Sequence, residues 1–302
     1  MLNKLTFRHI AMYAALLITS LVWGFSLPAQ ARGMEQLNDS ANGFNAVSSL
    51  LGALALLVPI MLMKTQRRAA VSGSGRLWLK GIVCGVVMTA ASLLQQWALK
   101  DTTAGKTGFL SSLYVVAVPL LGALFHRRST IGLWAATALS VFGVWLLCRP
   151  TGGAAFTWGD LCALACAVFF AIHILLIDRW SELESLPFCA FQLVTTGILS
   201  FVAAAVCRDR LTWDGFVQAL PLLLYCGVLS IGAGYTVQIY TQKFLHPTAS
   251  AIILSTESFF ALLGGWLFLG ERLSRPILLG GAAIFAATII AQLFGAGKPV
   301  RE

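Results

Sequence analysis

Charged side chains are scarce in this sequence. They make up 11% of its 302 residues, whereas hydrophobic residues make up 58%. A soluble domain carries about 25% charged residues, so this chain has too few to cover a surface that faces water. A soluble fold would also leave large apolar patches exposed to solvent. The shortage of charge therefore excludes a water-soluble domain and predicts an integral membrane protein.

Signatures of catalysis are also missing. The sequence has no P-loop, so ATP is not a direct energy source, and it has neither an H-E-x-x-H nor a G-x-S-x-G motif. Its seven cysteines do not gather in a loop, which argues against a disulfide framework. Cys162 and Cys166 share one helix face, but we interpret them as packing residues rather than a metal or redox pair. We therefore expect no enzyme activity, no metal and no cofactor.

Acidic residues are the rarer charged kind, since 12 of them stand against 21 lysines and arginines. In a soluble protein this balance suggests binding to nucleic acid. Here the basic residues lie between apolar runs, where they indicate the orientation of membrane helices, so we expect no nucleic-acid partner. With the N-terminus in the cytoplasm, more basic residues fall inside than outside, chiefly because of segment 64–80. The second half of the chain shows no such bias.

Apolar runs occupy almost the whole chain. A membrane-spanning helix needs about 20 mostly apolar residues, whereas a barrel strand needs about 10 residues of alternating polarity. The runs here are long and do not alternate, and lipid requires internal backbone hydrogen bonding, so we expect helices. They leave no room for a soluble domain. The ten predicted helices lie at residues 9–31, 42–63, 76–98, 104–125, 131–149, 157–177, 187–207, 217–239, 247–269 and 276–295.

The first apolar run could instead be a cleaved leader. Lys4 and Arg8 precede it, and residues 29–31 end it in an A-x-A pattern, which is typical of a secretory signal peptide. However, the run is long enough to span a membrane, and it carries Trp23 and Pro28, which a discarded leader would not need. We expect it to be retained as the first spanning helix.

Weak internal similarity relates the two halves of the chain. A slide of 145 residues brings Thr103 onto Thr248, and a slide of 147 brings Trp23 onto Phe170. If ten helices are two copies of five, the odd number inserts the second copy upside down. Inverted repeats of this kind are typical of secondary transporters.

Four stretches resemble a known family. They are W-G-F at 23–25, the polar and aromatic stretch 95–120, F-F-A-I-H-I-L at 169–175, and 248–273, which ends in L-G-E-R-L. Together they are similar to the EamA family of the drug/metabolite transporter superfamily. The resemblance covers nearly the whole chain, and it is more specific for the family than for any substrate.

The resemblance implies an all-α integral membrane protein with ten transmembrane helices, arranged as two inverted five-helix repeats at residues 1–150 and 151–302. It implies cytoplasmic termini and a central cavity between the first, third, fourth, sixth, eighth and ninth helices. It also implies metabolite transport, often the export of amino acids or related compounds, and we place this in a bacterial inner membrane.

Two departures from the family pattern bear on the substrate. Relatives often carry an arginine where this sequence has Ser48. A positive charge that could hold an anion is therefore absent, so an anionic substrate is less expected. The first repeat often carries a glutamate where this sequence has His126, opposite Glu271 of the second repeat. A symmetric role for that pair is therefore not expected.

Glu257 is the most informative single residue, because it lies near the middle of the predicted helix at 247–269. A carboxylate at that depth is costly and should face a cavity or a partner. It could contact the amine of a substrate or carry a proton, which leaves proton coupling open. The alternative is a structural glutamate that forms a hydrogen bond between helices.

Several neutral polar residues are further candidates for the substrate site. His173 lies near one end of its predicted helix and could sense pH, although a packed histidine with one hydrogen bond is the simpler interpretation. Gln95, Gln96 and Gln238 lie at corresponding ends of two predicted helices. Their amides suit a neutral or zwitterionic ligand. Hydrogen bonding between helices would explain them equally well.

Aromatic residues could line the same cavity and offer a ring face to a cation. The candidates are Trp23, Tyr114, Tyr235 and Tyr240. For each of them, a place at the membrane interface or in simple packing is the rival interpretation.

Two further features point to helix packing and bending. Gly81 and Gly85 form a G-x-x-x-G pattern, which permits close contact between helices. Pro119 is expected to kink the helix predicted at 104–125.

The sequence therefore predicts a secondary transporter that moves small organic molecules by alternating access in a lipid bilayer. Export is the first expectation, and uptake by the same fold is the alternative. A channel or a non-transporting scaffold is the rival from another class, although the polar residues are few and scattered for a pore. The helices at 131–149 and 276–295 are the least polar, so we expect them to face lipid or another subunit of an oligomer.

Overall fold

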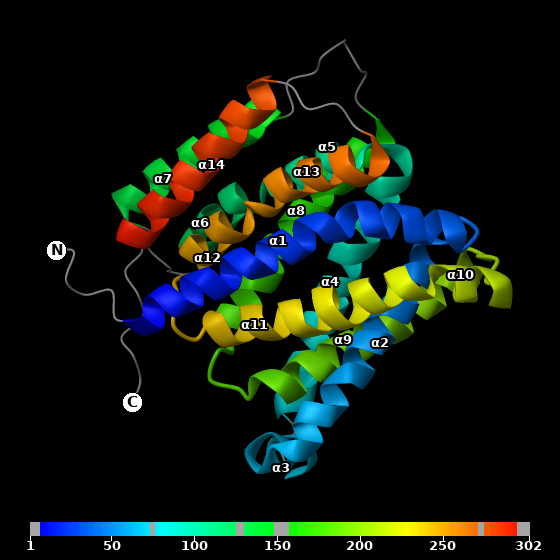
Figure 1. The fold of residues 1–302 in the computed structure, drawn as a ribbon. Helices are drawn as coiled ribbons and strands as arrows, with labels where there is room; N and C mark the ends of the chain where they lie inside the picture. Colours follow the sequence, from blue (N-terminus) through cyan, green and yellow to red (C-terminus); the bar gives the residue numbers. More distant parts are fainter. Residues whose placement is uncertain (1–6, 73–75, 125–129, 148–156, 271–274, 295–302) are drawn as a thin grey trace.

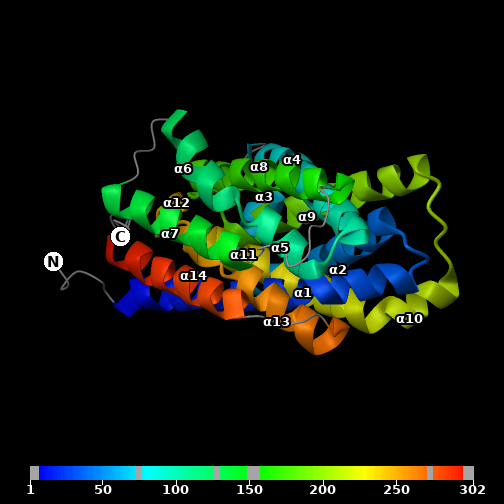
Figure 2. The same cartoon turned by 90° about the horizontal axis from the view of Figure 1, so that it is seen from above.

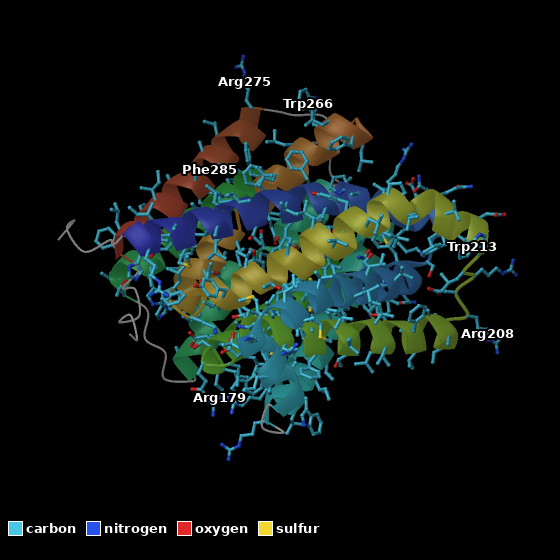
Figure 3. All side chains as sticks on the ribbon, turned by 60° about the horizontal axis from the view of Figure 1, so that its bottom comes forward. Arg179, Arg208, Trp213, Trp266, Arg275 and Phe285 are labelled. Atoms are coloured by element: carbon cyan, nitrogen blue, oxygen red, sulfur yellow. The ribbon has the colours of Figure 1, made fainter. Side chains whose placement is uncertain are left out.

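The computed structural model describes residues 7–72, 76–124, 130–147, 157–270 and 275–294, and within these ranges it contains helices and no strands. The helices form one bundle, with the two halves of the chain interleaved (Figure 1). Figure 3 shows Arg179, Arg208 and Arg275 at the margins of this bundle, with their side chains directed outward. The charged groups thus lie at helix ends, where water or lipid headgroups can solvate them.

Among the described residues, eight helical spans are long and apolar enough to cross a membrane. They are α1 (Phe7–Gln36), α2 (Ala41–Leu62), α4 (Arg76–Asp101), α5 with α6 (Ala104–Ser111 and Tyr114–Leu124), α8 (Trp158–Arg179), α9 (Ser185–Val206), α10 with η2 and α11 (Trp213–Leu224, Tyr225–Ala233 and Gly234–Thr241), and α12 with α13 (Pro247–Leu254 and Glu257–Leu269). Two further apolar helices, α7 (Ile131–Leu147) and α14 (Arg275–Phe294), have shorter apolar stretches.

All ten predicted segments are therefore helical, and their ends agree with the prediction to within about five residues. Eight of them meet the length and polarity that a membrane crossing requires, so ten crossings stay a prediction. The sequence did not predict α3 (Lys64–Ser72), a short helix in the basic segment that follows α2. Residues 29–31, considered above as a cleavage site, lie inside the continuous helix α1.

Many helices of one half of the chain pack against helices of the other half, and equivalent helices make equivalent contacts. The helix α1 packs against α12 and α13, and α8 packs in the same way against α5 and α6. The helix α4 contacts α8 and α9, whereas η2 contacts α1 and α2. Two further pairs, α2 with α9 and α7 with α14, join equivalent helices. These contacts between the two halves thus come in equivalent sets.

The pair α7 and α14 lies along one side of the bundle in both views (Figures 1 and 2). Their outer faces carry exposed large apolar side chains, including Phe142, Trp145, Leu279 and Ile289. An apolar face of this extent is suited to lipid or to another apolar surface. No described residue of α7 or α14 lines the central cavity described below, and the expectation that they face lipid or another subunit stays a prediction.

Two helices are broken at equivalent places. The chain of α5 and α6 is interrupted at Ser112, and that of α12 and α13 at Ser255. At each break the serine hydroxyl donates to the backbone carbonyl three residues before it, over 2.9 Å and 2.7 Å respectively. Such side-chain bonds compete with the helical pattern and favour a turn. The half-helices then cross, because α5 lies against α13 and α6 against α12.

These breaks correct the register expected between the two halves. The helix caps at Thr103 and His246, like the breaks at Ser112 and Ser255, are 143 residues apart, so the register of these helices is 143 rather than 145. Pro119 lies inside α6, beyond the interruption, so it does not mark the break.

The G-x-x-x-G pattern brings α4 against α9. A Cβ atom added at Gly81 would lie 2.6 Å from the Cβ of Phe191, and one added at Gly85 would lie 2.6 Å from the Cβ of Thr195. The hydroxyl of Thr196 also donates to the carbonyl oxygen of Gly85 over 3.2 Å. The absence of side chains therefore allows the two backbones to approach, as the pattern predicts.

We predict that Gly85→Val destabilises the protein by about 1–3 kcal/mol, because the new side chain overfills the contact between α4 and α9. The measurement is the midpoint temperature of unfolding in detergent. Ala205→Val is the control, since Ala205 is exposed on α9. Equal midpoints for the two variants would show that this contact does not limit stability.

Candidate functional site

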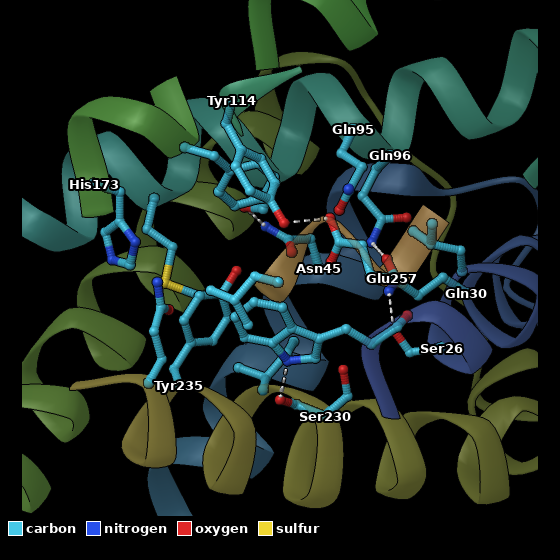
Figure 4. Close-up of a pocket in the computed structure, with 18 of the residues that line it drawn as sticks. Ser26, Gln30, Asn45, Gln95, Gln96, Tyr114, His173, Ser230, Tyr235 and Glu257 are labelled. Carbon is cyan, nitrogen blue, oxygen red and sulfur yellow. Dashed lines mark hydrogen bonds between the residues drawn. The ribbon is translucent and has the colours of Figure 1, made fainter. Parts of the chain in front are cut away.

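A central cavity lies where the two broken helices meet (Figure 4). Its lining comes from both halves of the chain. The first half supplies side chains from α1, α2, α4 and α6, and the second half supplies side chains from α8, η2, α11, α12 and α13. Apolar walls with a few polar groups are typical of sites that bind small organic ligands.

Glu257 and Tyr114 meet at the centre of this cavity. Each is the first residue after one of the two helix breaks, and the two are equivalent in the 143-residue register. The Tyr114 hydroxyl donates to Oε1 of Glu257 over 3.2 Å, and the Glu257 side chain is only 6% exposed. The dipole of a helix favours negative charge at its first residues. The break thus places Glu257 at a helix start that suits a carboxylate.

A chain of hydrogen bonds runs along one side of the cavity. Nε2 of Gln96 donates to Oε1 of Gln30 over 2.6 Å, and Nε2 of Gln30 donates to the Ser26 hydroxyl over 2.9 Å. The Ser26 hydroxyl donates in turn to the carbonyl oxygen of Trp23 over 2.7 Å. This chain ties α4 to α1 beside Glu257.

Asn45 forms a second polar connection on the same side. Its Nδ2 donates to the hydroxyls of Ser92 and Ser200, over 2.9 Å and 2.8 Å. Because both partners lie on other helices, this one amide joins α2 to α4 and α9. Its two N–H donors are both used within the protein.

Aromatic rings form the opposite side of the cavity. Tyr235 lies between Trp23 and His173, with ring centroids 4.8 Å and 5.6 Å away. Phe170 lies edge-on to Tyr114, with centroids 6.4 Å apart. Figure 4 shows His173 and Tyr235 together on one side, with Gln30, Gln95 and Gln96 on the other. The cavity is therefore aromatic at one side and amide-rich at the other.

The π-helix η2 connects to this aromatic side. The indole N–H of Trp23 donates over 2.8 Å to the carbonyl oxygen of Ser230, which lies within η2. Short π-helical segments often occur at functional sites. On its other face η2 approaches α2 closely, since a Cβ atom at Gly227 would lie 2.6 Å from the carbonyl oxygen of Ser48.

The sequence matches the EamA-like transporter family twice, over residues 10–149 and again over residues 157–292. The chain belongs to the EamA-like transporter family. It is a multi-pass membrane transporter, as its apolar helices require.

One relative of this EamA transporter is similar to it over most of its length, and another over about half of it. An uncharacterized transporter of Archaeoglobus fulgidus is 27% identical over 284 residues, which cover 92% of this chain and 84% of the relative. The threonine/homoserine exporter RhtA of Salmonella typhimurium is 28% identical over 175 residues, which cover 57% of this chain and 58% of the relative.

A solved structure titled "Crystal structure of protein" has the same fold. It superposes with a TM-score of 0.75 over 95% of this chain and 99% of its own, at 15% sequence identity. At this identity the likeness concerns the fold alone.

The eight predicted site residues of this EamA transporter all line the one cavity. They are Trp23, Gln95, Gln96, Tyr114, His173, Tyr235, Gln238 and Glu257. They therefore lie close enough together to form one site. A role in binding substrate stays a prediction.

Tyr240 does not line the cavity. Its side chain is 44% exposed and packs against Phe244, with ring centroids 5.5 Å apart. Tyr240 follows Tyr235 by five residues, so the two side chains leave α11 in different directions. The membrane-interface interpretation suits Tyr240 better.

Sequence reasoning missed several lining residues. Asn45, a polar residue within an apolar run, was a usable signal, and so was the pair of Gln30 with Ser26 one helical turn earlier. Ser92 and Phe170 are common residues in membrane helices, so only the fold reveals their place. Short hydroxyl and apolar side chains give no such signal.

The departures from the family pattern have different outcomes. Ser48 is fully buried and lies outside the lining, and none of the described residues that line the cavity is a lysine or an arginine. His126 and Glu271 lie outside the described residues.

Cys162 and Cys166 are buried within α8, and the described part of the chain has no group of three metal-ligating side chains.

We predict that Tyr114→Phe destabilises the protein by about 1–3 kcal/mol, because Glu257 then loses its hydroxyl donor in a buried place. Tyr240→Phe is the control, since it removes the same hydroxyl from an exposed ring. The measurement is the unfolding midpoint of both variants in one detergent. A Tyr114→Phe protein as stable as the control would mean that the bond to Glu257 contributes nothing.

Proposed function

We propose that the chain exports amino acids or related small metabolites that carry an amine, with Glu257 as the contact for that amine. The supporting observation is the charge of the cavity. Among the described lining residues Glu257 is the one acidic side chain, and no lysine or arginine accompanies it. An ionisable residue in a membrane span is functional by default, and a protonated amine would supply the charge that the carboxylate lacks.

The proposed mechanism is alternating access between two inverted five-helix repeats, residues 1–150 and 151–302. One repeat rocks against the other around the central cavity. The equivalent helix contacts that the two halves make with each other support this division. The breaks at Ser112 and Ser255 supply places where a half-helix can tilt without bending a continuous helix.

Proton coupling is a natural extension of this mechanism. A carboxylate that holds either a proton or a substrate amine, but not both, exchanges one for the other. Entry of a proton from outside would then release the amine, and the proton gradient would drive export. When Glu257 holds neither a proton nor an amine, the Tyr114 hydroxyl is placed to donate to it.

The proposed direction is export, and the relative named threonine/homoserine exporter supports it. Uptake by the same cavity is the alternative. We place the protein in a bacterial inner membrane with both termini in the cytoplasm, following the basic residues of segment 64–80.

We predict that cells expressing the wild-type chain release at least one amine-bearing compound class that cells expressing Glu257→Gln retain. The substitution keeps the size of the side chain and removes its charge, so the release should fall about 10–100-fold, which is the loss of one hydrogen bond to a charged group. The measurement is untargeted metabolite analysis of cells and medium.

Glu35→Gln is the matched control, because it makes the same chemical change at an exposed residue of α1. It should release the compound at the wild-type rate. If the wild type, Glu257→Gln and empty-vector cells give the same profiles, export is wrong. An increase of the compound inside wild-type cells would instead indicate uptake.

We predict that a membrane-impermeant maleimide labels Cys207 in intact cells. Cys207 is exposed at the end of α9, which lies outside if the N-terminus is cytoplasmic. The other described cysteines are buried and should stay unlabelled. Mass spectrometry of the labelled peptides is the measurement, and Cys207→Ala is the control. Labelling of Cys207 only after the cells are broken would reverse the orientation.

A further inference from the structure

We propose that the cavity selects an amine attached to an aromatic or other bulky apolar body, and that it does not require a carboxylate on the ligand. This inference rests on the proposed function and narrows its substrate class. The juxtaposition behind it is the amide-rich side, the aromatic side and the Glu257 carboxylate between them (Figure 4).

The two sides differ although their backbones are equivalent. In the 143-residue register Gln95 corresponds to Gln238, and both line the cavity. The next lining position in α4 is Ser92, whereas its counterpart in α11 is Tyr235. Equivalent backbone positions therefore carry a hydroxyl on one side and a ring on the other. A ligand with one polar end and one apolar end matches this difference.

The hydrogen-bond chain on the polar side has a fixed direction. A backbone carbonyl can only accept, so Ser26 must donate to Trp23 and must accept from Gln30. Gln30 must then accept from Gln96, which sets the orientation of both amides. The Oε1 atom of Gln96 is left at the end of the chain, and the described part of the protein offers it no partner.

Two amide oxygens that line the cavity, one on each side, lack a partner among the described residues. Asn45 uses both of its N–H groups on serine hydroxyls. Oε1 of Gln238, like that of Gln96, is buried without a partner among the described residues. The longest donor contact is that of Gln95 Nε2 to the Ser111 hydroxyl, at 3.4 Å. Buried polar atoms require partners, so the ligand must itself donate.

An ammonium group fits this requirement, and a carboxylate does not. Three N–H donors of an ammonium can reach Glu257 and the amide oxygens near it. A ligand carboxylate is best held by a cationic side chain, yet the described lining has no lysine or arginine. It would also lie close to Glu257, and two like charges in a buried site repel each other.

The aromatic side accounts for the rest of the ligand. Phe170 and Trp23 line the cavity and are only partly buried, so a ligand can cover their ring faces. Ile174, Ile231 and Met88 add apolar surface beside them. Burial of an apolar body against these side chains contributes free energy that a small hydroxylated ligand cannot gain. Ring faces also attract a nearby cation.

The test is calorimetric titration of the purified full-length protein with phenethylamine, phenylalanine and threonine. We expect phenethylamine to bind at least ten-fold more tightly than threonine, and more tightly than phenylalanine. We expect Glu257→Gln to abolish the difference between phenethylamine and phenylalanine, because the charge that disfavours the carboxylate is gone.

Phe170→Ala tests the aromatic side. It should weaken phenethylamine binding about ten-fold and leave threonine binding unchanged. Phe169→Ala is the matched control, since Phe169 is the adjacent phenylalanine on α8 and lies outside the lining. The ligand panel on the wild-type protein keeps the test independent of how well the variants fold.

The outcomes separate this inference from the proposed function. Threonine or phenylalanine binding as tightly as phenethylamine overturns the inference, and so does the absence of binding by all three. Neither result affects Glu257-dependent export found in cells. A preference for phenethylamine without any Glu257-dependent export would support the inference on the cavity and overturn the proposed function.

Discussion

A carboxylate inside a membrane-spanning bundle loses its hydration, and it must find partners within the protein. Glu257 begins a half-helix, where the helix dipole favours negative charge. The Tyr114 hydroxyl, which donates to it, begins the equivalent half-helix of the other half of the chain. The two broken helices therefore meet at this one carboxyl group, while α1 packs on α13 and α8 packs on α6.

The backbone around this charge is nearly symmetric, but the side chains are not. Equivalent helices make equivalent contacts, and equivalent breaks lie 143 residues apart. A symmetric frame suits a protein that must expose one site to two sides of a membrane in turn. The proposed ligand has no such symmetry. The halves differ at the cavity in the pair Tyr114 with Glu257 and in the pair Ser92 with Tyr235, among others, and such differences make its two sides unlike.

The positions of the helices could be predicted because lipid demands long apolar runs with internal hydrogen bonds. The eight cavity residues could be predicted because polar and aromatic side chains stand out within such runs. The direction in which a side chain leaves its helix could not be judged as well, so the sequence left open whether Tyr240 lines the cavity. The breaks were also missed, because Ser112 and Ser255 are ordinary residues in a membrane helix and no glycine or proline marks them. The π-helix η2 depends on close approach to α2, which is a contact between distant segments.

The central claim is that the transported compound contacts Glu257. Its most direct test is the rate at which a membrane-permeant carbodiimide modifies this carboxylate, followed by mass spectrometry of the peptide that contains it. The account predicts that Glu257 reacts, and that the compound whose release depends on Glu257 slows the reaction in proportion to its occupancy of the site. If the compound is transported but leaves the rate of modification unchanged at saturating concentration, Glu257 is not its contact.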